Sequence, residues 1–234
     1  MIVDGTVWRS WGATGPGSPV RLDVARFVER PSPWPACLGL DVAKAKSNVT
    51  VWSAARFVGN ERQAEPLLIG AVVLDFDHPQ DKPGDFFALV ARALPGAQWG
   101  AHATVSSAPG AWRFRLIVPL PMPVEPLTHG LLSTHVRSAI WQARWGERDL
   151  PRSERADMTG WADASEVCNG PRACHIVPMV APCGAYVAHV QSGDRLPFAV
   201  ALEEERRALE LQGSPYALRV AEQRQRAAGL EVAA

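Results

Sequence analysis

Apolar residues recur along this chain with two periods, and the change of period predicts strands alternating with helices. Alternating or continuous apolar runs bounded by Gly and Pro indicate strands, and apolar residues spaced three and four apart indicate helices. We therefore expect strands over residues 68–77, 99–106, 111–120, 172–180 and 185–191, a turn over 107–110, and helices over 84–94 and 127–145. The first of these strands is apolar enough to lie in the centre of a sheet.

The two ends of the chain show weaker patterns. Residues 1–35 are rich in Gly, Pro and Trp, which predicts an irregular lead-in with one short amphipathic segment over 22–29. The residues from about 199 are rich in Glu, Arg, Ala and Leu and predict one or two exposed helices. We expect one domain over 1–195 and a helical tail over 196–234. The order of elements predicts an α+β fold around a mostly antiparallel sheet.

Composition bears on whether this protein binds nucleic acid, a membrane or zinc. Among 234 residues, 24 are basic and 24 acidic, so nucleic acid would have to bind at a local cluster of arginines. Since no signal-peptide pattern or membrane-length apolar stretch is present in the sequence, we expect a cytoplasmic protein that does not contact a membrane. A zinc site at Cys168, Cys174, His175 and Cys183 is an alternative that the adjacent Cys-His pair disfavours, because neighbours on a strand face opposite ways.

The most informative feature is a pair of acids, Asp75 and Asp77, at the end of the apolar strand. Their side chains share one face of that strand, while Leu74 and Phe76 point to the other. Two neighbouring carboxylates in an apolar strand repel each other unless a cation lies between them, and Mg²⁺ and Mn²⁺ prefer oxygen ligands. The pattern predicts a divalent-metal site. The alternative is a strand end whose acids are solvated or cap the next helix.

A second group of polar residues lies on the predicted hairpin. His102, Thr104 and Ser106 alternate along its first strand and share a face, as do Arg113 and Arg115 on its second strand. Arginine forks beside hydroxyl groups match the geometry of a triphosphate. The alternative is a sheet face whose arginines pair with acids.

Two later segments add a third acid and another arginine. Asp163 lies in the sequence Trp-Ala-Asp-Ala-Ser, and Arg172 leads into a predicted strand that ends at Pro178.

Taken in order over roughly residues 45–190, these segments resemble the archaeo-eukaryotic primase superfamily, specifically the primase-polymerase domains of bacterial plasmids and phages. That family has an acidic motif at a strand end, a hydroxyl-rich turn followed by a basic strand, and a third acid before an Arg-containing strand. The matching residues are Asp75 and Asp77; His102, Thr104, Ser106, Pro109, Arg113, Arg115, Pro119 and Leu120; Ala162 and Asp163; and Arg172 to Pro178. The upstream segment from Trp52 to Phe57 is also similar.

The resemblance implies a primase-polymerase core, with an RRM-like, mostly antiparallel sheet flanked by helices. It implies template-directed nucleotidyl transfer, as a DNA primase or polymerase, in replication of a plasmid, phage or other mobile element. Asp75, Asp77 and Asp163 would be catalytic and hold two Mg²⁺ or Mn²⁺ ions. The implied nucleotide-binding residues are His102, Thr104, Ser106, Arg113, Arg115 and Arg172, and the implied DNA-binding residues are Arg56, Arg62 and Lys46. The implied partners are a single-stranded DNA template, nucleoside triphosphates and a replicative helicase.

The chain departs from the family at two places. Ser107 stands where many relatives have a second His, and the pair Cys174-His175 replaces a more usual aromatic before Pro178. Two alternatives therefore stay open. One is a non-catalytic primase-like module for DNA binding or assembly. The other is a metal-dependent nuclease or phosphohydrolase, which would use the three acids but would not explain the two arginines beside them.

Overall fold

The computed structural model of the chain describes residues 1–10, 13, 15–30, 32–33, 49–60, 66–76, 82–104, 107–145, 163–164, 177–178, 180–181, 186–194 and 196. The strands are β1 (Ile2–Trp8), β2 (Ser18–Asp23), β3 (Ser32–Pro33), β4 (Val51–Ser53), β5 (Ala55–Phe57), β6 (Pro66–Phe76), β7 (Trp99–Ala103), β8 (Phe114–Val124), β9 (Asp163–Ala164), β10 (Val177–Pro178), β11 (Val180–Ala181) and β12 (Ala188–Gln191). The helices are α1 (Val24–Glu29), α3 (Pro83–Ala93) and α4 (Pro126–Trp145), and a 3-10 turn, η2, covers Val58–Asn60.

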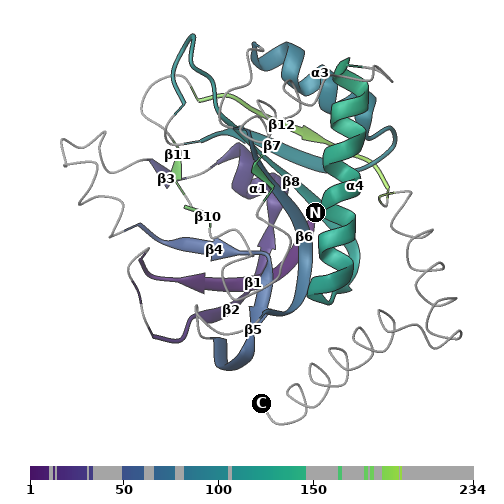
Figure 1. Cartoon of the computed structure of the whole chain (residues 1–234). Coiled ribbons are helices and arrows are strands. Elements are labelled where there is room, and N and C mark those ends of the chain that lie inside the picture. The colour runs from purple at the N-terminus through teal and green to yellow at the C-terminus, as the bar shows by residue number, and fades with distance from the viewer. Residues whose placement is uncertain are drawn as a thin grey trace, which may run out of the picture.

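The larger sheet has six strands (Figure 1). Its strands run in the order β12-β7-β8-β6-β5, and β9 pairs with the C-terminal end of β6. A four-stranded sheet, β10-β4-β1-β2, packs beside it, and both sheets are antiparallel. The short pair of β3 and β11 is parallel. This arrangement confirms the predicted α+β class with mostly antiparallel sheets.

The central strand β6 is buried on both faces, as its continuous apolar sequence predicts. Val72, Leu74 and Phe76 belong to a core formed with α3 and α4. The alternate residues Ala71 and Val73 belong to a second core, which includes α1 and the strands of the smaller sheet. Alternation along β6 therefore separates a face covered by two helices from a face directed at α1 and β1.

Most central elements form within a few residues of the predicted bounds. The helix predicted over 84–94 is α3, and the one predicted over 127–145 is α4. β7 ends at Ala103, earlier than the predicted 106. β8 begins later than predicted and continues through Pro121 to Val124, where we expected prolines to end it.

The prediction of an irregular N-terminal segment is wrong. Residues 2–8 and 18–23 form β1 and β2, which pair antiparallel, and α1 follows directly over Val24–Glu29. Pro19 is tolerated because β2 is the edge strand of its sheet, where one side of the backbone needs no partner. The C-terminal residues 197–234 lie outside the described residues, so the helical tail stays a prediction.

Candidate functional site

One row of directly opposed residues crosses the larger sheet near the C-terminal end of β6. Ala188 on β12 lies opposite His102 on β7, and His102 lies opposite Arg115 on β8. Arg115 in turn lies opposite Asp75 on β6, and the backbone of Asp75 lies opposite that of Asp163 on β9. The fold thus places residues of all three predicted motifs opposite one another on neighbouring strands.

This row lies on the face of the sheet directed at α1. Ile117, two positions after Arg115 on β8, belongs to the core on that face. A Cβ atom added at Gly100, two positions before His102, would meet Val28 of α1 at 3.0 Å. The imidazole of His102 itself packs edge-on against Phe27, with ring centroids 5.6 Å apart.

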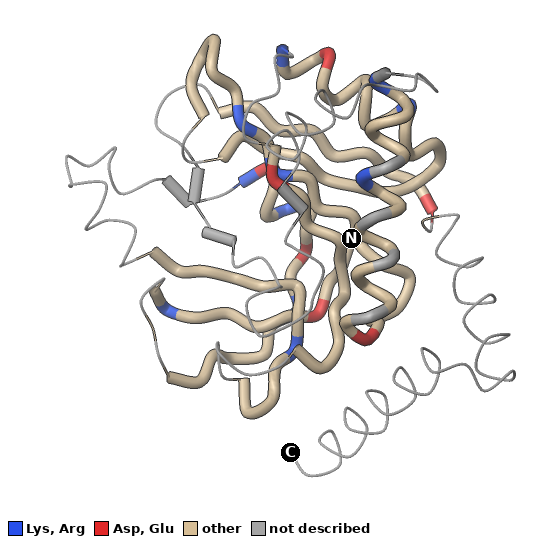
Figure 2. The backbone as a smooth tube through the Cα atoms, in the orientation of Figure 1, with Lys and Arg blue, Asp and Glu red and all other residues tan. Residues whose placement is uncertain are grey.

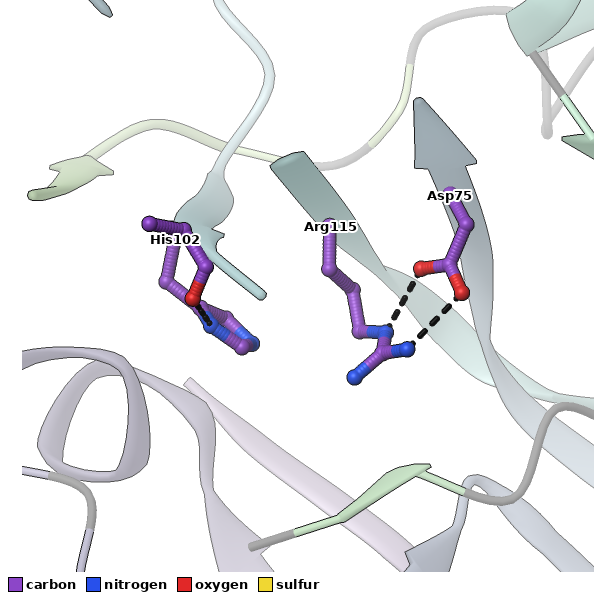
Figure 3. A network of polar contacts seen from close by, with 4 residues as sticks. Asp75, His102 and Arg115 are labelled. Atoms are coloured by element: carbon purple, nitrogen blue, oxygen red, sulfur yellow. Dashed lines mark hydrogen bonds and ion pairs between the residues drawn. The ribbon is translucent and has the colours of Figure 1, made fainter. Parts of the chain in front are cut away.

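Arg115 and Asp75 form a forked ion pair (Figure 3). Nε of Arg115 donates to Oδ1 of Asp75 at 2.7 Å, and Nη2 donates to Oδ2 at 2.8 Å. Only 10% of the Arg115 side chain and 20% of the Asp75 side chain are exposed. Pairs of this geometry are among the stronger polar contacts in proteins. The alternative interpretation of the hairpin, in which its arginines pair with acids, therefore holds for Arg115 in this structure.

His102 is neutral at pH 7 because its ring is buried. Burial, with a further contribution from the positive charge of Arg115, lowers the pKa of His102 to about 4. Nδ1 lies 3.0 Å from the carbonyl oxygen of Ala103, and since a carbonyl only accepts, Nδ1 carries the hydrogen. Nε2 is left with a lone pair and has no hydrogen-bond partner within the described residues. A neutral acceptor cannot bind the oxygens of an ionised triphosphate, so His102 in this state can take only a hydrogen-bond donor.

The turn between β7 and β8 forms where the sequence predicts it. Ala108 and Ala111 exchange two backbone hydrogen bonds around Pro109 and Gly110, whose φ of 83° suits glycine in a type II turn. This confirms the predicted turn. The hydroxyl of Ser107 accepts from the backbone N–H of Arg113 at 3.0 Å. Ser107 therefore stabilises the hairpin, a role that its hydroxyl next to a Pro-Gly turn could have indicated.

Two other predicted nucleotide-binding residues lie at this hairpin. Thr104 is buried, and its backbone N–H donates to the carbonyl of Arg113. Arg113 directly precedes β8, and its hydrogen bond with Thr104 continues the register of His102 and Arg115 by one pair, so its position on the same face as Arg115 stays a prediction. Both residues stay candidates for nucleotide binding because they flank the row.

Arg56 is not brought to this row. It lies on β5 opposite Leu68, near the other end of β6 from Asp75. The other predicted site residues, namely Asp77, Ser106, Arg62, Lys46 and Arg172, lie outside the described residues, as do the cysteines of the alternative zinc site.

Two acids of the row, Asp75 and Asp163, have the ligand chemistry that a divalent cation prefers. Asp75 and Asp163 are directly opposed on neighbouring antiparallel strands, where Cα atoms lie about 4.5–5.5 Å apart. Carboxylate oxygens are the ligands that Mg²⁺ and Mn²⁺ prefer. Within the residues that the structure describes, no group of three or more His, Cys, Asp or Glu side chains is positioned to hold a metal ion. Asp77, the remaining predicted ligand, follows the last residue of β6 directly.

Along the described backbone, positions of Lys and Arg are interspersed with positions of Asp and Glu (Figure 2). No helix in the described part of the chain combines the length and hydropathy that crossing a bilayer requires.

Comparisons of the chain with protein-family models, with curated proteins and with solved structures found no match.

Proposed function

We propose that this protein is a primase-polymerase, which joins nucleotides on a single-stranded DNA template during replication of a plasmid, phage or other mobile element. The observation that supports this most is the register of Arg115, Asp75 and Asp163 in one row across β8, β6 and β9. These residues come from the three motifs of the resemblance and are far apart in sequence. If the three motif matches were accidental, their residues would not be expected to lie on adjacent strands.

In the proposed reaction, a 3′-hydroxyl attacks the α-phosphate of a nucleoside triphosphate and pyrophosphate leaves. Asp75, Asp77 and Asp163 would hold two divalent ions, which lower the pKa of the attacking hydroxyl and neutralise charge on the phosphates. Arg115 and Arg113 would bind the triphosphate oxygens, since a guanidinium fork matches their geometry. Asp75 and Arg115 are directly opposed on β6 and β8, which supports the proposal that metal ions and the triphosphate would bind at one site.

A second candidate is a non-catalytic primase-like module that binds DNA or assembles a replication complex. The forked ion pair favours it, because Arg115 already neutralises Asp75 without a metal ion. In such a module the acids would serve stability, and the arginines would contact phosphates only electrostatically.

Extension of a labelled nucleotide on single-stranded DNA separates the two. The protein is incubated with template, Mn²⁺ or Mg²⁺, and either ribo- or deoxynucleoside triphosphates, with and without an annealed primer. We expect metal-dependent product, lost in Asp163→Asn and kept in Asp85→Asn, which removes one charge from an exposed position on α3. A protein that binds the template but makes no product with either metal and any nucleotide would support the binding module.

A further inference from the structure

Arg115 lies between two different acceptors. On one side, Asp75 takes both of its forked N–H groups. On the other side, His102 lies directly opposite Arg115 on β7 and projects from the same face of the sheet (Figure 3). Within the described residues, Asp75 is the only hydrogen-bond partner of the Arg115 side chain.

The contact with Asp75 conflicts with metal binding. A carboxylate offers about four lone-pair positions over its two oxygens, and the fork occupies one on each. A divalent ion bound to the same carboxylate would lie within a few ångströms of the guanidinium, and like charges at that separation repel strongly in a half-buried site. A metal ion that takes Asp75 as a ligand must therefore weaken or displace the fork.

The second acceptor gives the displaced guanidinium a partner. His102 is 1% exposed, its Nδ1 is committed to the Ala103 carbonyl, and its Nε2 lone pair is unsatisfied within the described residues. Buried polar atoms without a partner are uncommon in native proteins and call for an explanation. A donor arriving at Nε2 from the adjacent strand would provide one.

We propose that Arg115 is an exchangeable counter-ion with two positions. Without metal it neutralises Asp75. When a divalent ion binds Asp75, the guanidinium turns toward Nε2 of His102 and presents its remaining N–H groups to the triphosphate. Metal and nucleotide therefore bind cooperatively through one side chain, and His102 is a positioning residue rather than a phosphate ligand. This inference rests on the proposed function, because it takes Asp75 as a metal ligand.

The test is Mn²⁺ affinity measured by titration calorimetry or by the electron paramagnetic resonance of free Mn²⁺, in the absence of nucleotide. Arg115→Met removes the competing charge and keeps the apolar stem, so we expect Mn²⁺ to bind about ten-fold more tightly than to the parent. His102→Phe removes the alternative acceptor at similar volume, so Mn²⁺ should bind several-fold more weakly. In the double variant, His102→Phe should have no further effect, because its role depends on Arg115.

Arg92→Met is the matched control, since Arg92 lies on α3 and donates to the carbonyl of Ala143 on the other face of the sheet. Its Mn²⁺ affinity should equal that of the parent. Thermal unfolding with and without EDTA verifies that each variant is folded, and Arg115→Gln, which also removes the charge, replaces Arg115→Met if the latter does not fold.

The outcomes separate the inference from the proposed function. A parent that binds Mn²⁺ and extends primers, with an Arg115→Met variant that binds Mn²⁺ no more tightly, would overturn the inference alone. Equal effects of His102→Phe with and without Arg115 would overturn the role of His102. Parent and Arg115→Met proteins that both fail to bind Mn²⁺ and to extend DNA would overturn the inference and the proposed function together.

Discussion

Arg115 and Asp75 face each other across β8 and β6 and are joined by two hydrogen bonds of 2.7 and 2.8 Å. Through this pair, the acidic motif at the end of β6 and the basic strand of the hairpin are in direct side-chain contact. We expected the carboxylates of the acidic motif to repel each other unless a metal ion lay between them. The fold instead supplies a cation of its own, because Arg115 lies beside Asp75.

Removing either partner should therefore destabilise the metal-free protein. Asp75→Asn leaves the Arg115 charge in a mostly buried position without its carboxylate. We expect a loss of about 2–3 kcal/mol in the free energy of unfolding, below the range for a fully buried pair because Asp75 is one-fifth exposed. Urea unfolding in EDTA measures it. The double variant with Arg115→Met should lose less than the sum of the single changes, and strict additivity would contradict an energetically coupled pair.

Burial of neutral His102 predicts a specific loss of stability in mild acid. Its pKa is about 4 in the folded protein, where Arg115, Asp75 and the rings of Phe27 and Tyr186 surround it, and about 6.5 in the unfolded chain. Between these values the unfolded chain binds the proton and the folded protein does not. Stability contributed by this group is thus present above pH 6.5 and is lost as the pH falls toward 4.

The corresponding measurement compares urea unfolding at pH 7 and pH 5. His102 should account for a loss of about 2 kcal/mol over this interval. His102→Asn retains an N–H near the position of Nδ1 for the Ala103 carbonyl but does not titrate. Its loss of stability between the two pH values should be smaller than that of the parent by this amount. An identical loss in both proteins would show that folding does not lower the pKa of His102.

The sequence predicts the core of this fold well because the determining signals are local. β6 is a long apolar run, and α3 begins at a proline and ends before Pro95 and Gly96. β1 was missed because Asp4 and Gly5 interrupt its apolar alternation. Its stability as a strand comes from pairing with β2 on one side and β4 on the other, which no local pattern reveals.

The site was predictable in its members but not in its contacts. Alternation and motif order place Asp75, His102 and Arg115 together, and the register confirms that they are adjacent. The forked pair and the tautomer of His102 depend on side-chain conformation and burial, which sequence spacing does not determine. Ser107 illustrates the same limit. By resemblance it is a departure from relatives that have a His, and in the fold its hydroxyl accepts a hydrogen bond from the backbone of Arg113.

A histidine of α4 provides a prediction about the fold that supports this site. Nε2 of His129 donates to the carbonyl of Ala71 at 3.1 Å, and the residue opposite Ala71 on β8 is Pro119, which has no N–H to donate. His129→Leu removes the donor from a buried carbonyl and should cost about 1–3 kcal/mol by chemical denaturation. Ser133→Ala, which loses only a 3.5 Å contact to His129, should cost less than about 1 kcal/mol. A larger effect of the serine variant would contradict this account.

Close packing of the smaller sheet leaves no room at Gly5 on β1. A Cβ atom there would lie 2.1 Å from the carbonyl oxygen of Ser53 and 2.6 Å from Nε1 of Trp52. Gly5→Ala should destabilise the protein by about 2 kcal/mol or more, because the backbone at Ser53 would have to move away from the added Cβ atom. Gly84→Ala is the control, because a Cβ atom at this position of α3 meets nothing within 4 Å. It should stabilise by up to about 1 kcal/mol through helix propensity, as measured by thermal unfolding.

The sharpest prediction about activity concerns Asp77, which follows the last residue of β6 in the sequence and lies outside the described residues. Asp77→Asn keeps the size of the side chain and removes one negative charge. If the acids hold two metal ions, primer extension should fall by orders of magnitude, because both metal affinity and transition-state stabilisation decrease.

Two further properties should be preserved in the same variant. The free energy of unfolding in EDTA should hold or rise, because Asp77→Asn relieves repulsion among the acids, whereas Asp75→Asn deprives Arg115 of its partner. Under the proposed function, template binding and its dependence on salt should persist, because basic residues rather than Asp77 would contact the phosphates. Asp85→Asn, an exposed acid in the first turn of α3, should leave extension and template binding unchanged and lower the free energy of unfolding by less than about 1 kcal/mol. An Asp77→Asn protein that extends primers as fast as its parent would refute the catalytic assignment, since no two-metal site could lose a ligand charge without loss of rate.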